Sequence, residues 1–404
     1  MTSRIPALTP SAGATVSDLA DQGEPAGRPM LAVTDAEQAA AALLPGDVWD
    51  FVSGSSGAEL TERANRAALD SVFLVPRVLR DVSACRAGTE LLGRSAAIPV
   101  AIAPMAYQRM IHPDGELGMA RAAKAAGVPF TVAMLASETI EQVAAVGADV
   151  WLQLYWLKDR AVTLDLVRRA ERSGCRALML TVDVPALGRR LRDLRNGFSF
   201  PDGVTPVNLS GESAKLVPAG ADGPRGGVAD ANGGVAGYSA VAAHTAATFD
   251  PALSWNDVAW LRDQTDLPLV LKGILDPADA RRAADLGVAG IVVSNHGGRQ
   301  LDGAVPSVTA LPWIIDAVGG RCQVLMDGGI RGGTDVLKAL ALGASGVLLG
   351  RPALWGLAAG GAAGATRVLT LLSEEFSHAM VLAGCSDLAS VRALRTVTER
   401  SQVR

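Results

Sequence analysis

The stretch Ser294–Asp302 brings together a hydroxyl, an amide, an imidazole, a guanidinium and a carboxylate. The apolar run Ile291–Val293 leads directly into it and predicts a buried strand. Two glycines inside the stretch let the backbone turn tightly and approach a ligand closely. A solvated polar turn would explain His296 or Arg299 alone. Five such groups around a Gly-Gly pair, directly after a buried strand, favour a functional site.

The elements that must position this stretch repeat along the chain from residue 98. Short apolar runs alternate with amphipathic stretches, and glycines such as Gly127 and Gly287 end several of the predicted helices. Eight such units in about 250 residues predict an α/β fold of the TIM (β/α)8 barrel type, with a doubly wound sheet as the alternative. The predicted strands are Val100–Ala103, Phe130–Met134, Val150–Leu154, Ala177–Val182, Leu269–Lys272, Gly290–Ser294, Gln323–Asp327 and Gly346–Leu349. The predicted helices include Glu116–Ala126, Ile140–Val146, Ala161–Ser173, Pro277–Leu286 and Gly333–Leu342.

Helices are also predicted ahead of the barrel. Thr34 followed by Glu37 indicates a capped helix over residues 36–44, and a second helical run covers residues 58–69. Phe51 lies between the two, where it belongs either to the core or to the site.

Two segments fall outside this pattern. Residues 1–30 are rich in small and turn-forming residues without an apolar run, which predicts a disordered extension ahead of one barrel domain at residues 31–404. Residues 198–254 follow the fourth strand and are rich in Gly, Pro, Ala and Ser. A long insertion of this composition predicts a mobile lid.

Composition excludes several classes of protein. The chain has 404 residues and a net charge of −4, so no strongly basic face for nucleic acid is expected. No apolar run is long enough for a secretory signal or a membrane span, and we expect a cytoplasmic protein. The cysteines form no CxxC pair, so neither a metal site nor a disulfide framework is predicted; they are Cys85, Cys175, Cys322 and Cys385.

The last residues of the predicted strands should face one cavity, because they meet at one end of a barrel. Lys272 lies in an apolar strand, where a buried lysine needs an anion; a structural ion pair is the alternative. The glycine-rich turns 327–333 and 349–352 follow the last two strands. Their backbone N–H groups, together with Arg331 and Arg351, predict a phosphate site.

The 294–302 stretch resembles the signature of the FMN-dependent α-hydroxy-acid oxidizing enzymes, the family of glycolate oxidase and mandelate dehydrogenase. Other blocks are similar to the family as well, and the resemblance covers almost the whole chain from about residue 31; these blocks are Ala103–Ala106, Gln108–Pro113, Gln153–Tyr155, Thr181–Pro185 and Gly188–Arg190. The resemblance implies a barrel enzyme with FMN as its cofactor, a small α-hydroxy acid as its substrate and O2 as the acceptor. It also implies a homo-oligomer, in this family a tetramer.

The resemblance further implies a role for individual residues. The implied cofactor-binding residues are Ala103, Pro104, Met105, Ala106, Gln153, Thr181, Lys272, Ser294, Asp327 and Gly329, with Arg331, Gly350 and Arg351 at the phosphate. The implied catalytic residues are His296, Asp183, Tyr155 and Arg299, and the implied substrate-binding residues are Arg190, Arg299, Tyr155, Phe51, Tyr107 and Leu135. In this scheme His296 takes the hydroxyl proton while Asp183 fixes its tautomer. Arg190 and Arg299 hold the substrate carboxylate through charge-assisted bonds.

Three departures from the family pattern bear on the substrate. Phe51 stands where a tyrosine is usual, Met134-Leu135 stands where glycolate oxidases carry Ser and a large Trp, and Ala133 lacks a hydroxyl often used on the flavin. The predicted pocket is therefore roomier and more apolar than one for glycolate, and the chain is most similar to the 4-hydroxymandelate oxidases of peptide-antibiotic pathways. The predicted reaction turns (S)-mandelate or 4-hydroxymandelate into the 2-keto acid. The alternatives are a quinone-linked mandelate dehydrogenase, a lactate- or glycolate-type oxidase, a monooxygenase and, outside the family, a non-redox barrel that binds a phosphorylated metabolite.

Overall fold

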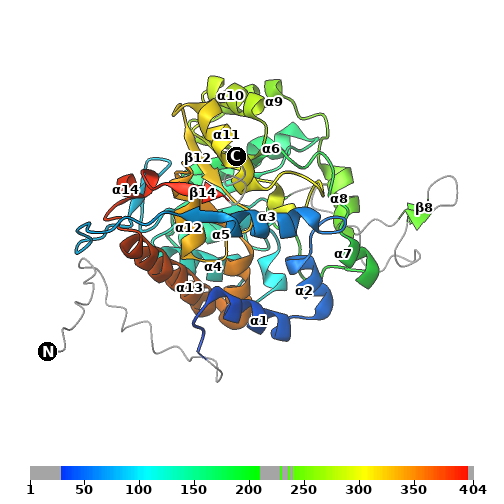
Figure 1. The fold of residues 1–404 in the computed structure, drawn as a ribbon. Helices are drawn as coiled ribbons and strands as arrows, with labels where there is room; N and C mark the ends of the chain where they lie inside the picture. The colour runs from blue at the N-terminus through cyan, green and yellow to red at the C-terminus, as the bar shows by residue number, and fades with distance from the viewer. Residues whose placement is uncertain (1–28, 210–227, 230–234, 237–239, 399–404) are drawn as a thin grey trace.

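The computed structural model describes residues 29–209, 228–229, 235–236 and 240–398. Within this part of the chain, eight parallel strands form a closed barrel surrounded by helices (Figure 1). The last strand pairs with the first, with Val347 opposite Val100. This closure confirms the predicted barrel and rules out the doubly wound sheet, which has open edges. The predicted N-terminal extension, residues 1–30, lies almost entirely outside the described residues.

The barrel strands are short apolar runs with almost every side chain buried, as expected of parallel strands that helices cover. They are β4 (Val100–Met105), β5 (Phe130–Ala133), β6 (Val150–Leu154), β7 (Ala177–Thr181), β10 (Leu269–Ile274), β11 (Gly290–Val293), β12 (Gln323–Met326) and β13 (Gly346–Leu349). All eight coincide with predicted strands to within two residues at either end. Side chains such as Trp151, Met179 and Leu325 form the apolar cluster inside the barrel, so the barrel is packed and its polar groups gather at one end.

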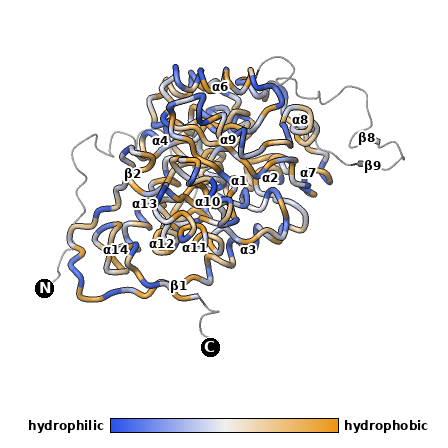
Figure 2. The backbone as a smooth tube through the Cα atoms, turned by 90° about the horizontal axis from the view of Figure 1, so that it is seen from above, coloured by the Kyte–Doolittle hydropathy of each residue, from blue (hydrophilic) through white to orange (hydrophobic). Residues whose placement is uncertain are grey.

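Helices cover the outside of the barrel. They are α4 (Gly115–Ala126), α5 (Ile140–Ala145), α6 (Arg160–Arg172), α9 (Trp255–Arg262), α10 (Pro277–Asp285), α11 (Ser307–Val318), α12 (Gly333–Ala341), α13 (Arg351–Leu382) and α14 (Leu388–Arg392). Thr139, Asp159 and Asp276 each accept a backbone N–H in the first turn of α5, α6 and α10, which stabilises the start of a helix. Gly127 ends α4 at a φ of 64°, as a helix-terminating glycine should. In Figure 2 hydrophilic segments lie along the outer edge near α6.

The longest helix, α13, was not among the predicted helices. It begins directly after β13 and packs against α4 and α12. Non-helical angles at Gly360 and Gly361 kink it, and glycine is a common cause of such a kink. Two small antiparallel sheets lie outside both the barrel and the insertion: β1 (Val72–Leu74) with β14 (Thr396–Thr398), and β2 (Thr89–Leu91) with β3 (Arg94–Ala96).

Three helices precede the barrel: α1 (Val33–Leu43), α2 (Gly46–Ser53) and α3 (Leu60–Asp70). The predicted cap at Thr34 is wrong, because Thr34 lies inside α1 and Ala32 is the capping position. The Asp35 carboxylate accepts the backbone N–H groups of Leu31 and Ala32 at 2.8 and 2.9 Å. The acidic partner three residues into the helix is thus Asp35 rather than Glu37. The segment holding Phe51, for which no helix was predicted, is α2.

The insertion at residues 198–254 falls partly outside the described residues, so its predicted mobility stays a prediction. Its described parts include the strand pair β8 (Val228–Ala229) and β9 (Val235–Ala236) and the helix α8 (Ala240–Thr248), and α7 (Leu191–Asn196) leads into it. Lys158 donates to the carbonyls of Ala246 and Ala247 at 2.6 and 3.1 Å. These bonds hold the end of α8 beside the β6–α6 loop. No helix in the described part of the chain is both long and apolar enough to cross a membrane.

Candidate active site

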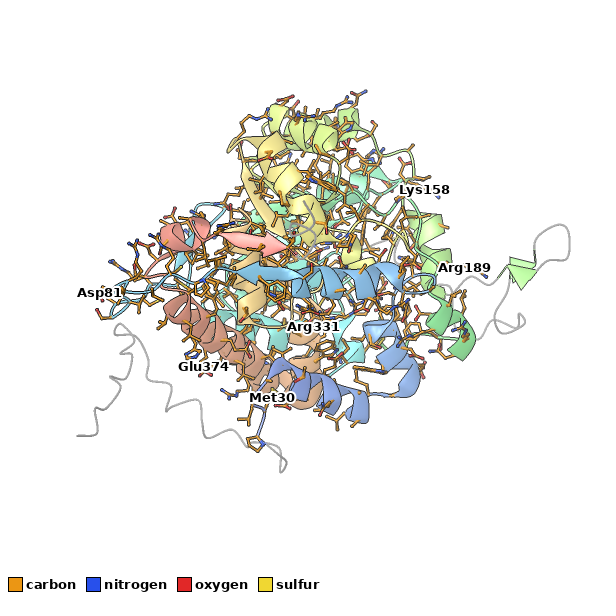
Figure 3. All side chains as sticks on the ribbon, viewed as in Figure 1. Met30, Asp81, Lys158, Arg189, Arg331 and Glu374 are labelled. Carbon is orange, nitrogen blue, oxygen red and sulfur yellow. The ribbon has the colours of Figure 1, made fainter. Side chains whose placement is uncertain are left out.

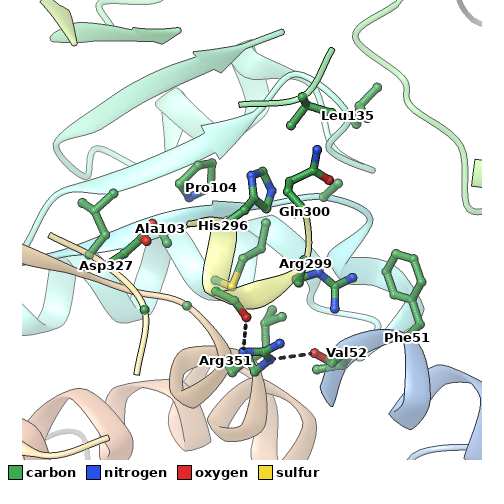
Figure 4. Close-up of a pocket in the computed structure, with 18 of the residues that line it drawn as sticks. Phe51, Val52, Ala103, Pro104, Leu135, His296, Arg299, Gln300, Asp327 and Arg351 are labelled. Atoms are coloured by element: carbon green, nitrogen blue, oxygen red, sulfur yellow. Dashed lines mark hydrogen bonds between the residues drawn. The ribbon is translucent and has the colours of Figure 1, made fainter. Parts of the chain in front are cut away.

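A cavity opens at the carboxyl ends of the barrel strands (Figure 4). Its empty space is about 1250 Å³, including solvent at its mouth. Most of the predicted site residues line it: Phe51, Ala103, Pro104, Met105, Ala106, Tyr107, Leu135, Tyr155, Arg190, Lys272, His296, Arg299, Asp327, Gly329, Arg331, Gly350 and Arg351. The other four predicted residues are not part of the lining; they are Gln153, Thr181, Asp183 and Ser294. Hydrogen bonds join these four residues to one another or to the lining. Gln153 donates to the Thr181 hydroxyl at 3.1 Å, and Lys272 donates to the Ser294 hydroxyl at 3.0 Å.

His296 and Asp183 form a partly buried pair, with 3.0 Å between the His296 Nδ1 and the Asp183 Oδ1. Burial would raise the pKa of the Asp183 carboxyl, but His296 and Lys272 outweigh it and lower that pKa. Burial is also the largest influence on His296 and lowers its pKa below 6.5, despite the attraction of Asp183. An ionised Asp183 can only accept, so Nδ1 must carry the proton of the neutral ring. The Nε2 lone pair is then available to accept a proton.

Local backbone geometry makes this pair possible. His296 has a φ of 58°, a left-handed conformation that costs energy in a residue with a side chain and is often found at functional sites. On the neighbouring strand β10, Gly273 has a φ of 110° at an irregularity in the pairing. A Cβ on Gly273 would lie 2.6 Å from the Cβ of Asp183. The irregular strand and the missing side chain therefore provide the space that Asp183 occupies.

Lys272 is a second buried group whose charge is matched by the protein. Its Nζ lies 3.0 Å from the Asp327 Oδ2 and donates to the Ser294 hydroxyl at 3.0 Å. Burial would lower the pKa of Lys272, but Asp327 and Asp183 outweigh it and raise that pKa. The other carboxylate oxygen of Asp327, Oδ1, is buried without a hydrogen-bond partner among the described residues. Lys272 is thus a fixed cation, and Asp327 retains a free acceptor.

Two arginines on the substrate side lack such a match. Arg190 and Arg299 have no carboxylate within ion-pair distance in the described chain, and the Arg190 Nε is buried without a partner. Arg299 donates to the Gly54 carbonyl at 2.6 Å. Burial lowers the pKa of both guanidinium groups, and the pKa of Arg299 is lowered further by repulsion from Arg190. Two cations held this close together in a cavity favour binding of an anion.

Arg331 and Arg351 form a second cationic group beside the glycine-rich turns. Arg351 donates to the carbonyls of Val52 and Gly297, as Figure 4 shows, and to the Ser55 hydroxyl at 2.8 Å. Burial and repulsion from Arg331 lower the pKa of Arg351 to about 10. In Figure 3 Arg331 lies near the middle of the view, whereas the exposed Arg189 lies at the edge. The N-terminus of α13 adds its helix dipole, so this group can bind a phosphate.

Aromatic and apolar side chains complete the wall. The Phe51 ring stacks on Phe198 at 4.5 Å between centroids and meets Phe200 edge-on at 6.2 Å. Phe200 also packs on Tyr107 at 4.3 Å, and Tyr155 stacks on a phenylalanine after α8. No charged group is needed to bind a ring placed against this wall.

Sequence reasoning missed the part of the cavity wall that α8 and the residue directly after it supply. Val241, Thr245 and Phe249 all line the cavity. They are four residues apart and so fall on one face of a helix. That spacing was visible inside the predicted lid, but the surrounding Ala, Gly and Ser residues obscured it.

Known proteins are similar to this chain in sequence and in fold. A family model described as FMN-dependent dehydrogenase matches residues 40–397. The chain is 53% identical over 366 residues to the 4-hydroxymandelate oxidase of Amycolatopsis orientalis, covering 91% of this chain and 98% of the relative. It is 46% identical to the L-lactate oxidase of a Nostoc species, covering 88% and 94%. The solved structure of a mandelate oxidase with (S)-4-hydroxymandelic acid is similar with a TM-score of 0.84 and 52% identity, covering 91% of this chain and 99% of that one.

Proposed function

Because the chain belongs to the FMN-dependent dehydrogenase family, we propose that it oxidises an aryl (S)-2-hydroxy acid of the mandelate type to the 2-keto acid, with O2 as the electron acceptor. FMN is its cofactor, and an α-hydroxy acid is its substrate. The observation that carries the finer proposal is the position of the His296–Asp183 pair. It lies beside two unmatched arginines, in a cavity whose remaining wall is aromatic and apolar.

The residues present fit FMN. Arg331, Arg351 and the N-terminus of α13 offer a positive site for its phosphate, although Glu62 lies 3.6 Å from Arg331. The Asp327 carboxylate oxygen that has no partner could accept a hydrogen bond from a hydroxyl of the sugar-alcohol chain. Lys272, with Gln153, Thr181 and Ser294 nearby, offers donors to the polar edge of the ring. When bound, FMN would accept the electron pair and the hydrogen that leave the substrate carbon, together a hydride equivalent.

In the proposed mechanism, Arg190 and Arg299 bind the substrate carboxylate and so fix the position of the adjacent carbon. The Nε2 of His296 then takes the proton of the substrate hydroxyl. Asp183 holds the proton on Nδ1 and stabilises the imidazolium that forms. Lys272 stays charged throughout, because Asp327 raises its pKa. Its charge would favour negative charge on a flavin ring bound beside it.

Tyr155 completes the proposed catalytic set. Its hydroxyl is electrostatically coupled to Asp183, Lys272 and the two substrate arginines, and burial raises its pKa. A neutral phenol among these groups can donate to an oxygen of the substrate. The Tyr155 ring is held by stacking on Phe249, so the insertion contributes to the position of this hydroxyl.

Steady-state kinetics on a panel of hydroxy acids, with oxygen uptake recorded, test this proposal. We expect kcat/KM for (S)-mandelate or 4-hydroxymandelate to exceed the values for glycolate and L-lactate by at least about 10-fold, since each methylene-sized apolar group bound contributes about that factor. Oxygen uptake should match keto acid formed. Turnover that requires an added quinone would contradict the choice of acceptor, and a preference for glycolate would contradict the choice of substrate. The predicted tetramer, cytoplasmic location and part in peptide-antibiotic synthesis stay predictions.

A further inference from the structure

Tyr107 carries a buried hydroxyl that the mechanism above does not use. Its side chain lines the cavity and is 1% exposed. The hydroxyl oxygen has no hydrogen-bond partner among the described residues. A buried polar group without a partner is costly, so a ligand atom or a water should satisfy this hydroxyl in the working enzyme.

The backbone of Tyr107 is also unusual. Its φ is 57°, and among residues with side chains that line the cavity only His296 shares this left-handed conformation in the described chain. The Tyr107 N–H donates to the Leu135 carbonyl at 3.2 Å and so secures the turn. A strained conformation persists where the surrounding structure requires it, often at functional sites. Here the strain directs a phenol, rather than the small side chain that would fit such a turn more easily, into the cavity wall.

A row of aromatic rings connects this hydroxyl to the carboxylate-binding end of the cavity. The Arg299 guanidinium lies 5.3 Å from the centroid of the Phe51 ring. Phe51 contacts Phe200, which packs on Tyr107. Both ends of the row, Phe51 and Tyr107, line the cavity. An aryl hydroxy acid whose carboxylate is at Arg299 can lie along this row, with the far side of its ring toward Tyr107.

We propose that the Tyr107 hydroxyl hydrogen-bonds the phenolic hydroxyl of a para-hydroxylated aryl 2-hydroxy acid, and so makes the enzyme selective for 4-hydroxymandelate over mandelate. This inference rests on the function proposed above. Burial raises the pKa of Tyr107, so its hydroxyl stays neutral and can donate or accept. The phenol of the substrate has the same two capacities, so the pair can form in either direction. Mandelate lacks the group and would leave the Tyr107 hydroxyl unsatisfied.

The test compares kcat/KM for 4-hydroxymandelate and for mandelate in the unaltered enzyme and in Tyr107→Phe. The ratio of the two values should fall about 10-fold in the variant, the size expected for one hydrogen bond in a buried site. The fall in kcat/KM should be larger for 4-hydroxymandelate than for mandelate, because only 4-hydroxymandelate loses a hydrogen bond. A ratio that does not change would overturn the proposal. Bound FMN, measured by its absorbance, should be equal in both proteins, and an equal loss on both substrates would also overturn the proposal.

Phe200→Leu serves as the matched control. It alters the packing on the Tyr107 ring and keeps the hydroxyl, so its effect should be similar on both substrates. A fall in the ratio as large as that of Tyr107→Phe would assign the selectivity to packing and overturn the proposal. Turnover by the unaltered enzyme of aliphatic hydroxy acids only would refute the proposed function together with this inference. Turnover of both aryl acids with a ratio insensitive to Tyr107→Phe would refute this inference alone.

Discussion

Four cations of the cavity fall into two groups. On the flavin side, Lys272 has the Asp327 carboxylate at 3.0 Å, and its pKa is raised. By contrast, Arg190 and Arg299 at the proposed carboxylate site and Arg351 at the proposed phosphate site have no carboxylate within ion-pair distance in the described chain, and their pKa values are lowered. All four line one cavity. What differs is whether the protein supplies the opposite charge itself.

The difference indicates what each group is for. A cation with its own carboxylate keeps a constant charge whether or not a ligand is present. An arginine without a carboxylate partner is stabilised most when an anion binds. The anion offsets both the cost of removing the unpaired charge from water and the repulsion between neighbouring arginines. Changes in the protein-matched pairs should therefore affect the chemical step. Changes in the unmatched arginines should affect the binding of carboxylate or phosphate.

The largest effect is expected at the matched pair His296–Asp183. His296→Ala should lower kcat by about 10²- to 10⁴-fold, the usual cost of removing a general base. FMN should stay bound, and mandelate should still perturb the flavin spectrum, because the arginines remain. Stopped-flow and steady-state measurements with equal flavin content check this. A variant with near-normal kcat would remove His296 from the mechanism.

A smaller effect is expected at Arg299. Arg299→Lys keeps the charge but loses the planar pair of donors, so kcat/KM for mandelate should fall about 10- to 100-fold, with a higher KM. The same substitution should lower kcat/KM for the neutral amide of mandelate much less, since the amide carries no charge for Arg299 to pair with. Arg189→Lys is the matched control, because Arg189 is exposed next to the buried Arg190. Equal losses on mandelate and its amide would contradict a carboxylate role.

A change at Arg351 should affect the cofactor rather than the substrate. Arg351→Gln should weaken FMN binding about 10-fold, the value of one charge-assisted interaction with phosphate, as measured by titration of the apoprotein. At saturating FMN the KM for mandelate should change little. Arg367→Gln on the same helix is the control, since its side chain is 41% exposed. Unchanged FMN affinity in Arg351→Gln would place the phosphate elsewhere.

The smallest effect concerns pH. The neutral form of His296 is the one that accepts a proton, and burial lowers its pKa below 6.5. The active form therefore persists to lower pH than for an ordinary histidine, and kcat/KM should decline only as the pH falls through a value below 6.5. Because Asp183 opposes this lowering, Asp183→Asn should move the midpoint still lower. A pH profile with its acid midpoint above 6.5 would contradict this.

Sequence reasoning located the reacting groups better than it located their surroundings. The 294–302 stretch and the barrel strands could be predicted, because glycine turns and apolar runs report local structure. The space that Gly273 leaves for Asp183 could not, since it depends on two strands distant in sequence coming together. Nor could the pattern alone distinguish Arg190 from Arg189. Only the fold shows that the first is buried in the cavity and the second lies outside it.

The pairing of β13 with β4 has a consequence for the order of events during synthesis. Val347 lies opposite Val100, so the barrel cannot close until nearly the whole domain has left the ribosome. Contacts so distant in sequence slow folding. The cavity is lined by residues from both of these strands and their flanking turns, such as Ala103 in β4 and Arg351 after β13. FMN should therefore join a chain that is already complete, and truncation before β13 should leave two exposed strand edges prone to aggregation.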